Sequence, residues 1–126
     1  MFIRAAPPGS RLLAASRAGS EQVRSWATVA PDHTIRIVLI NASRTRARTA
    51  LVHLSFRSRP AILERLEAPS AYATDGVTIA GQSFGAQTVT GALDGSARRS
   101  RIRADGDYRV KLPPASAAML TIPNRG

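Results

Sequence analysis

The chain has 126 residues, 44% of them hydrophobic, which is typical of one globular domain with its own core. It has 18 basic and 8 acidic residues, a formal net charge of +10, and no cysteine. The composition therefore excludes disulfides and thiolate chemistry, and no window reaches the ~18 consecutive apolar residues of a membrane-spanning helix.

The positive charge has two possible interpretations, and the sequence alone does not decide between them. It can attract polyanions such as nucleic acid, acidic polysaccharide or anionic lipid. It can equally be a solvated surface, or one covered by an acidic partner domain. Lys111 is the only lysine, and an almost pure arginine set also fits a GC-rich coding bias. Residues 1–16 lack the apolar stretch of a signal peptide, so we expect no export signal and assign no compartment.

Short runs of β-branched and aromatic residues, separated by Pro, Gly, Asp and Ser, predict strands and turns along most of the chain. Residues 1–6 are too few for an independent helix. Asp75-Gly76, Asp94-Gly95 and Asp105-Gly106 are turn dipeptides. The stretches that predict strands are, in chain order, Leu12–Ala15, Gln22–Val29, Thr34–Asn41, Ala50–Phe56, Ala61–Glu67, Val77–Ala80, Thr88–Leu93, Tyr108–Leu112 and Ala117–Ile122.

Three of these stretches carry more specific expectations. Thr34–Asn41 is apolar on both faces, which predicts a central strand covered on two sides. Trp26 is expected to pack inward from its strand. Ala61–Glu67 has residue types that also suit a helix, but its alternation and the flanking prolines favour an edge strand.

Apart from the entry strand at Leu12–Ala15, seven or eight short strands at this spacing predict an all-β fold, an antiparallel β-sandwich in a single domain. We expect an N-terminal extension at residues 1–21, the sandwich at 22–122 and a tail at 123–126.

Several segments, in order, resemble the C-terminal β-sandwich domain of glycoside hydrolase family 79, the β-glucuronidase and heparanase group. The resemblance covers roughly Gln22 to Ile122, and the head at residues 2–10 is similar to the end of the last barrel helix. The segments that carry it are Trp26-Ala27, Asp32-His33, Ile35–Asn41, Leu66–Ser70 (LEAPS), Gly76–Phe84 (GVTIAGQSF), Thr90-Gly91, Pro113–Leu120 (PPASAAML) and the closing pair of strands, Tyr108–Ile122.

The resemblance implies a non-catalytic accessory domain that packs on and stabilises a catalytic (β/α)8 barrel. In the family, two glutamates on that barrel perform retaining hydrolysis. A barrel needs about 250 residues, and the motifs that carry the glutamates have no counterpart here. The resemblance therefore implies no catalytic residue in this chain, and an isolated domain of this kind is expected to self-associate through its exposed apolar patch.

The remaining polar residues predict no catalytic, metal or cofactor site. Glu64 and Glu67 lie three positions apart on a strand, so they point to opposite faces and read as surface charge. His33 reads as a turn residue and His53 as a strand position, without the partners that a metal site needs. Ser83 lies in a G-x-S-x-G sequence, but a turn is the better interpretation because no helix or triad is predicted there.

Two arginine clusters remain as candidate polyanion sites. Alternate members could line one face of a strand and bind sulfate or phosphate oxygens in bidentate geometry. Neither cluster contains an aromatic residue, which argues against nucleic acid. The rival to the accessory domain is therefore a free-standing module for acidic polysaccharide, and autonomous hydrolysis is a third, weaker alternative. The candidate residues are Arg98, Arg99, Arg101 and Arg103 in one cluster, and Arg44, Arg46 and Arg48 in the other.

Overall fold

The structure is a computed structural model that describes residues 2–14, 22–55, 59–83 and 92–123. Apart from one helical turn, the described chain is all β, as predicted. Its elements are α1 (Phe2–Ala5), β1 (Arg11–Leu13), β2 (Val23–Val29), β3 (Ile35–Asn41), β4 (Arg48–Val52), β5 (Ala61–Glu67), β6 (Thr78–Ile79), β7 (Ser100–Ile102), β8 (Tyr108–Leu112) and β9 (Ser116–Ile122).

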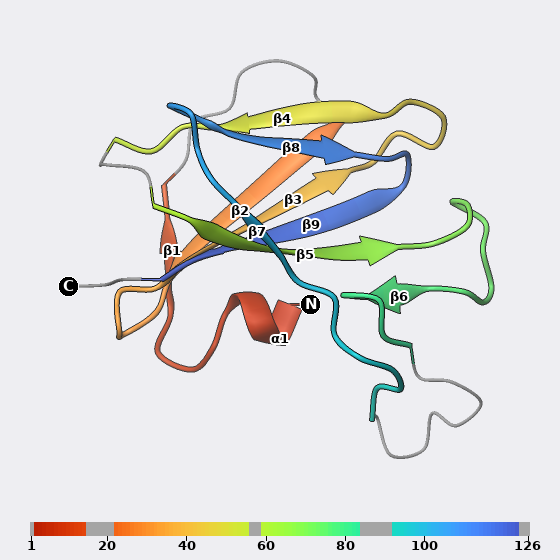
Figure 1. The fold of residues 1–126 in the computed structure, drawn as a ribbon, viewed down its shortest axis with the longest axis horizontal. Coiled ribbons are helices and arrows are strands. Elements are labelled where there is room, and N and C mark those ends of the chain that lie inside the picture. Colours follow the sequence, from red (N-terminus) through yellow and green to blue (C-terminus); the bar gives the residue numbers. More distant parts are fainter. Residues whose placement is uncertain (1, 15–21, 56–58, 84–91, 124–126) are drawn as a thin grey trace.

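The strands form two antiparallel sheets that pack as a sandwich (Figure 1). The large sheet has the order β1-β2-β3-β9-β5-β6, and β7 also pairs with β5. On the side of β5 away from β9, β7 pairs with Ala61–Leu63 and β6 with Leu66–Glu67. The small sheet consists of β4 and β8. The sandwich prediction is confirmed.

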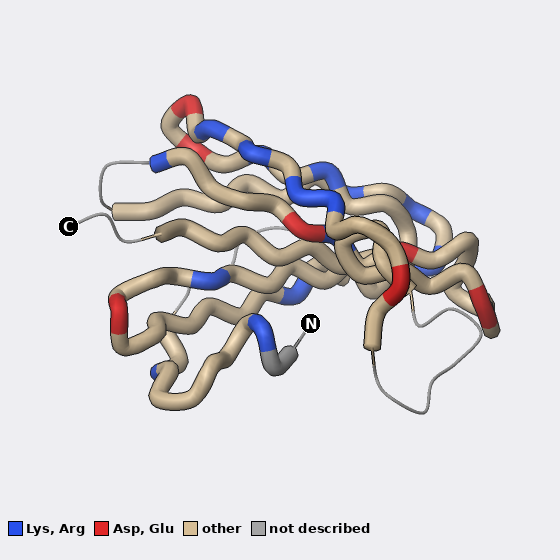
Figure 2. Tube along the Cα trace, turned by 60° about the horizontal axis from the view of Figure 1, so that its bottom comes forward, with Lys and Arg blue, Asp and Glu red and all other residues tan. Residues whose placement is uncertain are grey.

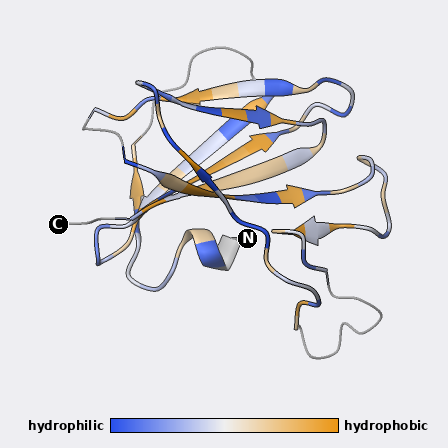
Figure 3. Cartoon of the chain, viewed as in Figure 1, coloured by the Kyte–Doolittle hydropathy of each residue, from blue (hydrophilic) through white to orange (hydrophobic). Residues whose placement is uncertain are grey.

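The core lies between the two sheets. Orange and blue segments alternate along β8 in Figure 3, since successive side chains point to opposite faces of a strand. Tyr108 is fully buried, and its hydroxyl donates to the carbonyl of Arg59 and accepts from the amide of Arg59 at 3.1 Å. The buried core residues are Ile37, Leu39, Ala61, Leu63, Tyr108, Val110, Leu112, Ala118, Leu120 and Ile122.

Most predicted strands are present, with differences in position. The prediction for Tyr108–Leu112 is confirmed to the residue, and the strand expected at Ala50–Phe56 lies earlier, at Arg48–Val52. Ala61–Glu67 is a strand, but the edge position was wrong, because β5 pairs on both sides. Of the expected strand at Thr88–Leu93, residues 88–91 lie outside the described residues, and the last two are not in a strand.

β7 was not predicted at all. Its sequence, Ser-Arg-Ile, lacks the apolar alternation that indicates a strand, and its pairing with β5 joins segments about 40 residues apart in the chain. The helical turn α1 falls in a segment judged too short for an independent helix, and it is held by contacts to the sheet that are described below. No described helix is long and apolar enough to cross a membrane.

Asn41 ties the end of β3 to the opposite sheet. It is 1% exposed, and its Nδ2 donates to the carbonyls of Arg46, Leu112 and Pro113 at 2.8–3.1 Å. Its Oδ1 accepts from the amide of Ser43 at 3.0 Å. One side chain therefore satisfies backbone groups in the β3–β4 loop and at the end of β8.

Replacing Asn41 by Ala should lower the free energy of unfolding by about 2–4 kcal/mol, because several buried backbone groups lose their partner at once. Urea unfolding followed by circular dichroism measures this loss. Gln82→Ala is the control, because the Gln82 amide donates to the Gly95 carbonyl at the surface. Equal effects of the two substitutions would show that the Asn41 network does not stabilise the fold.

Candidate interaction face

The face of the large sheet that points away from β4 and β8 is here called the outer face. It carries both apolar and charged side chains. The strand register places Trp26, Val38, Met119 and Glu64 in one row across β2, β3, β9 and β5. The two neighbouring rows run Thr28, Arg36, Thr121, Ile62, Arg101 and Arg24, Ile40, Ala117, Leu66, Ile79.

An apolar groove of about 440 Å³ lies on this face. Trp26 is 55% exposed and Leu12 is 68% exposed, so large apolar side chains at the groove meet solvent. Trp26 was expected to pack inward, and this expectation was wrong. The strand at Thr34–Asn41 was expected to be covered on both faces, but β3 is covered completely on one face only. The lining residues are Ala5, Ala6, Ser10, Leu12, Trp26, Thr28, Arg36, Val38, Ile40, Leu66 and Ala117.

The N-terminal segment forms one wall of the groove, and specific contacts hold it there. The Thr28 hydroxyl on β2 donates to the carbonyl of Ala5 at the end of α1. Gly9 has φ +82°, and a Cβ at this position would lie 2.9 Å from the ring of Pro31. Only glycine combines this conformation with this close approach, so the chain can turn from α1 into β1 beside the β2–β3 turn.

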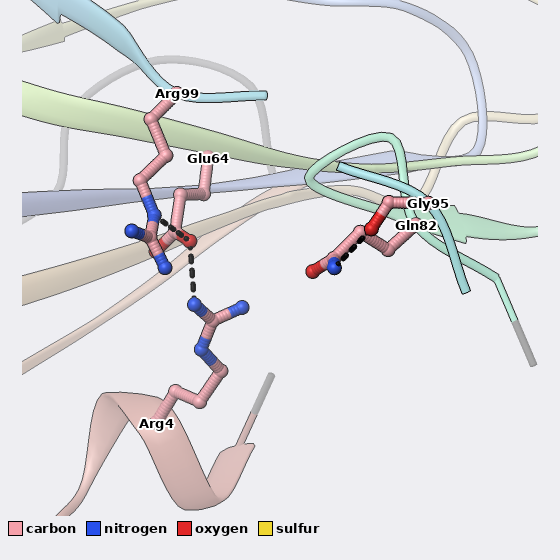
Figure 4. Close-up of polar contacts among 5 residues, drawn as sticks. All are labelled: Arg4, Glu64, Gln82, Gly95 and Arg99. Atoms are coloured by element: carbon pink, nitrogen blue, oxygen red, sulfur yellow. Dashed lines mark hydrogen bonds and ion pairs between the residues drawn. The ribbon is translucent and has the colours of Figure 1, made fainter. Parts of the chain in front are cut away.

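Glu64 is the centre of an ionic cluster next to the groove. Its Oε1 lies 2.7 Å from Nη2 of Arg4 on α1 and 3.1 Å from Nε of Arg99. Figure 4 shows the two arginines reaching this oxygen from opposite sides. The residue is 5% exposed, so the expectation of a solvated surface charge was wrong. Because a buried carboxylate needs such partners, Glu64 fixes both arginines.

A tight turn positions the segment that carries Arg99. Ala80 and Gly81 have φ of 51° and 76°, and the Ile79 and Gln82 backbones exchange two hydrogen bonds across them. The Arg98 amide donates to the Ala80 carbonyl. A Cβ on Gly81 would lie 2.9 Å from the Arg98 side chain, so this glycine lets the arginine stem pack on the turn.

The first predicted arginine cluster is therefore divided between two environments. Arg99 is engaged by Glu64, and Arg101 lies beside Ile62 on the outer face. Arg98, Arg101 and Arg103 are exposed. Figure 2 shows basic positions following one another along the upper part of the chain trace. A polyanion-binding role for these side chains remains a prediction.

The second cluster, in the β3–β4 loop and at the start of β4, is used partly for structure. Arg44 Nη1 donates to the Tyr72 hydroxyl at 2.9 Å, and its guanidinium lies 5.4 Å from the centre of that ring. Arg48 Nη2 donates to Gln22 at 2.9 Å. The Arg46 carbonyl accepts from Asn41. Sequence reasoning missed Tyr72 as the aromatic partner of this cluster, because it is 28 residues away from Arg44.

Other candidate residues have ordinary surroundings. His53 Nδ1 lies 2.7 Å from Oδ1 of Asp107 at the surface. His33, with φ 64°, lies in the turn that was predicted for it. The Ser83 backbone pairs with Asp94. Within the described residues no group of three His, Cys, Asp or Glu side chains could hold a metal ion.

Comparison with known proteins agrees with this architecture. Residues 25–119 match the sequence model described as the glycosyl hydrolase family 79 C-terminal beta domain. No individual curated protein sequence matches the chain.

Solved structures share the fold at low sequence identity. A 4-O-α-L-rhamnosyl-β-D-glucuronidase from Fusarium oxysporum 12S has a TM-score of 0.63 at 19% identity over 78% of this chain. A GH30 endoxylanase from Clostridium papyrosolvens C71 has a TM-score of 0.65 at 13% identity over 98%. An α-L-arabinofuranosidase from Thermotoga maritima has a TM-score of 0.56 at 14% identity over 82%. The chain spans only 23%, 26% and 19% of these proteins, respectively.

Replacing Glu64 by Gln should release the N-terminal segment from the sheet, because a neutral amide cannot hold two guanidinium groups equally well. We expect a loss of roughly 1–3 kcal/mol in the free energy of unfolding, and faster amide hydrogen exchange in α1. Urea unfolding and exchange mass spectrometry provide the two readouts. Glu67→Gln, an exposed position on the same strand, should change neither. Wild-type exchange in α1 of the Glu64 variant would contradict the anchoring role.

Proposed function

Since the chain belongs to the family of glycosyl hydrolase family 79 C-terminal beta domains, we propose that it is a non-catalytic accessory domain that packs on and stabilises a catalytic barrel. The observation that carries the proposal is the exposed apolar groove on the outer face, beside the N-terminal segment. A soluble domain rarely leaves such a surface uncovered unless another molecule or domain binds there.

The outer face has the composition of a docking surface. Trp26 and Leu12 are large, exposed and close to the half-buried Val38 and Ile40. Covering side chains of this size contributes about 1.5–3 kcal/mol each when burial is complete. Interface energy concentrates in aromatic residues surrounded by polar ones, and Trp26 has that position here, with the polar residues Thr28 and Arg36 beside it in the lining of the groove.

The carboxylates of the described chain support a role outside catalysis. Retaining glycosidases need two carboxyl groups about 5–5.5 Å apart, one acting as nucleophile and one as acid and base. Glu64 is buried and already paired with two arginines, and Glu67 is exposed on the same strand. We therefore propose that any hydrolytic activity belongs to a barrel, supplied by the same protein or by another chain.

A second candidate function is binding of an acidic polysaccharide along the segment of Arg98, Arg101 and Arg103. The observation that favours it is the exposure of all three side chains within six consecutive residues. Arg99 contributes less in this reading, because Glu64 already accepts its hydrogen bond.

The accessory role predicts that the chain binds and stabilises a family 79 barrel produced without its own sandwich domain. Trp26→Ser should weaken this association by about 2 kcal/mol or more, roughly 30-fold, because the aromatic anchor is lost. Isothermal titration calorimetry and the melting temperature of the barrel measure the effect. Leu51→Ser is the matched control, since Leu51 is 60% exposed on β4, on the opposite side of the sandwich.

Sedimentation of the isolated domain is an independent readout of the same face. We expect concentration-dependent self-association that Trp26→Ser reduces and Leu51→Ser does not. A wild-type domain that neither binds the barrel nor self-associates would count against the accessory role.

The polysaccharide alternative predicts salt-sensitive retention on immobilised heparin. Replacing Arg98, Arg101 and Arg103 together by Ala should then lower the salt concentration at elution, because fewer counterions are released on binding. Replacing Arg44, Arg46 and Arg48 by Ala gives the comparison for an equal change in net charge. If both triple variants elute at the same salt concentration, the segment has no specific role and the retention reflects net charge alone.

A further inference from the structure

Arg36 on β3 lies at the boundary between two cavities of the outer face. It lines the apolar groove, and it also lines a neighbouring polar pocket of about 390 Å³. No other residue that lines the groove also lines this pocket. The pocket is formed by Arg4, Pro7, Arg36, Ile62, Glu64, Arg99, Met119 and Thr121.

One nitrogen of the Arg36 guanidinium lacks a hydrogen-bond acceptor. Its Nη1 is buried and has no partner among the described residues. Leaving a charged donor in this state is costly, since such a group loses its hydration without gaining a protein partner. Ser10 Oγ, in the wall of the groove, is buried in the same way. A negatively charged group that binds the Arg36 guanidinium from the adjoining pocket would offset this cost.

The charges around the pocket indicate which acceptor fits. Three guanidinium groups, those of Arg4, Arg36 and Arg99, line the pocket together with a single carboxylate, Glu64. Figure 4 shows that two of these arginines converge on one oxygen of Glu64. The pocket therefore retains a surplus of positive charge next to the apolar side chains of Ile62 and Met119. In such surroundings a charge-assisted hydrogen bond is strengthened.

The nearest acidic residue along the chain, Asp32, offsets only a part of this surplus. Asp32 lies in the β2–β3 turn, where its Oδ1 accepts from the amide of Thr34 at 3.0 Å. This hydrogen bond is the main cause that lowers the pKa of Asp32 below its ordinary value, and the charge of Arg36 adds a smaller effect. Asp32 therefore keeps its negative charge, and when it is counted together with Glu64 one of the three guanidinium groups still lacks a matching carboxylate.

We propose that a carboxylate side chain of the docked barrel enters this pocket and binds the guanidinium of Arg36 while apolar side chains of the same surface fill the groove. The proposal rests on the proposed function. An acidic protein surface fits better than a sugar acid, because the groove that adjoins Arg36 offers few polar groups for sugar hydroxyls. Its lining is apolar except for Ser10, Thr28 and Arg36 itself.

The first experiment measures binding of the family 79 barrel to Arg36→Met and Arg24→Met domains. Arg24 is the matched control because it is exposed on the outer face and lines neither cavity. We expect Arg36→Met to raise the dissociation constant roughly 10- to 100-fold, and Arg24→Met to leave it within about twofold. Equal effects of the two variants, with intact wild-type binding, would overturn the carboxylate pairing and leave the accessory role standing.

A second experiment needs no barrel. Propionate, a small mimic of an acidic side chain, is titrated into the isolated domain at constant ionic strength, with chloride as the reference anion. The Nε–Hε resonance of Arg36 should shift in a saturable way with propionate, while that of Arg24 should not. A shift of the same size at both arginines, or none at Arg36, would overturn the proposal even if the barrel binds.

Arg36→Lys covers the case in which the methionine variant does not fold. It keeps the charge but loses the forked geometry that binds a carboxylate through two donors. We expect Arg36→Lys to bind the barrel more weakly than the wild type and Arg24→Met do. It should bind more strongly than a variant with an uncharged side chain at this position. Wild-type affinity for the lysine variant would show that Arg36 contributes only its charge, and would contradict carboxylate binding by the forked guanidinium.

Discussion

The two sheets differ in their number of strands, and the arrangement of the rest of the structure depends on this difference. β4 and β8 form a two-stranded sheet, and they cover one face of a sheet with seven strands. The opposite face of β3, β9 and β5 still carries apolar side chains, so it must find its cover elsewhere. The N-terminal segment supplies a part of that cover and the groove is what remains open. The position of the candidate interaction face follows from this difference.

Glu64 links the separate elements that form the outer face. Its carboxylate connects α1, β5 and the segment before β7, which are distant in the sequence. A buried ion pair is weak evidence for stability, because removing two charges from water is expensive. Its contribution here is geometric, since it fixes where the N-terminal wall stands relative to Arg36 and the groove. A docking partner would therefore meet one preformed surface.

Local sequence patterns predicted the strands well and their surroundings poorly. Alternation located Tyr108–Leu112 to the residue and indicated the paired apolar faces of β3. Alternation does not say which face is covered, and for this reason Trp26 was placed inside. The edge position of β5 and the exposure of Glu64 were wrong for a related reason. Both depend on β7 and α1, which pair with β5 or contact it from far along the chain.

The short edge strands of the large sheet affect how copies of the domain could associate when it is separated from its partner. β1, β6 and β7 are three, two and three residues long. Strands this short present few free backbone groups, so they are poor templates for the addition of further strands. If two copies associate through the outer face, each contributes the same patch, and such a pair is closed. The edges of the large sheet thus favour finite assemblies over growing fibres if the separated domain self-associates.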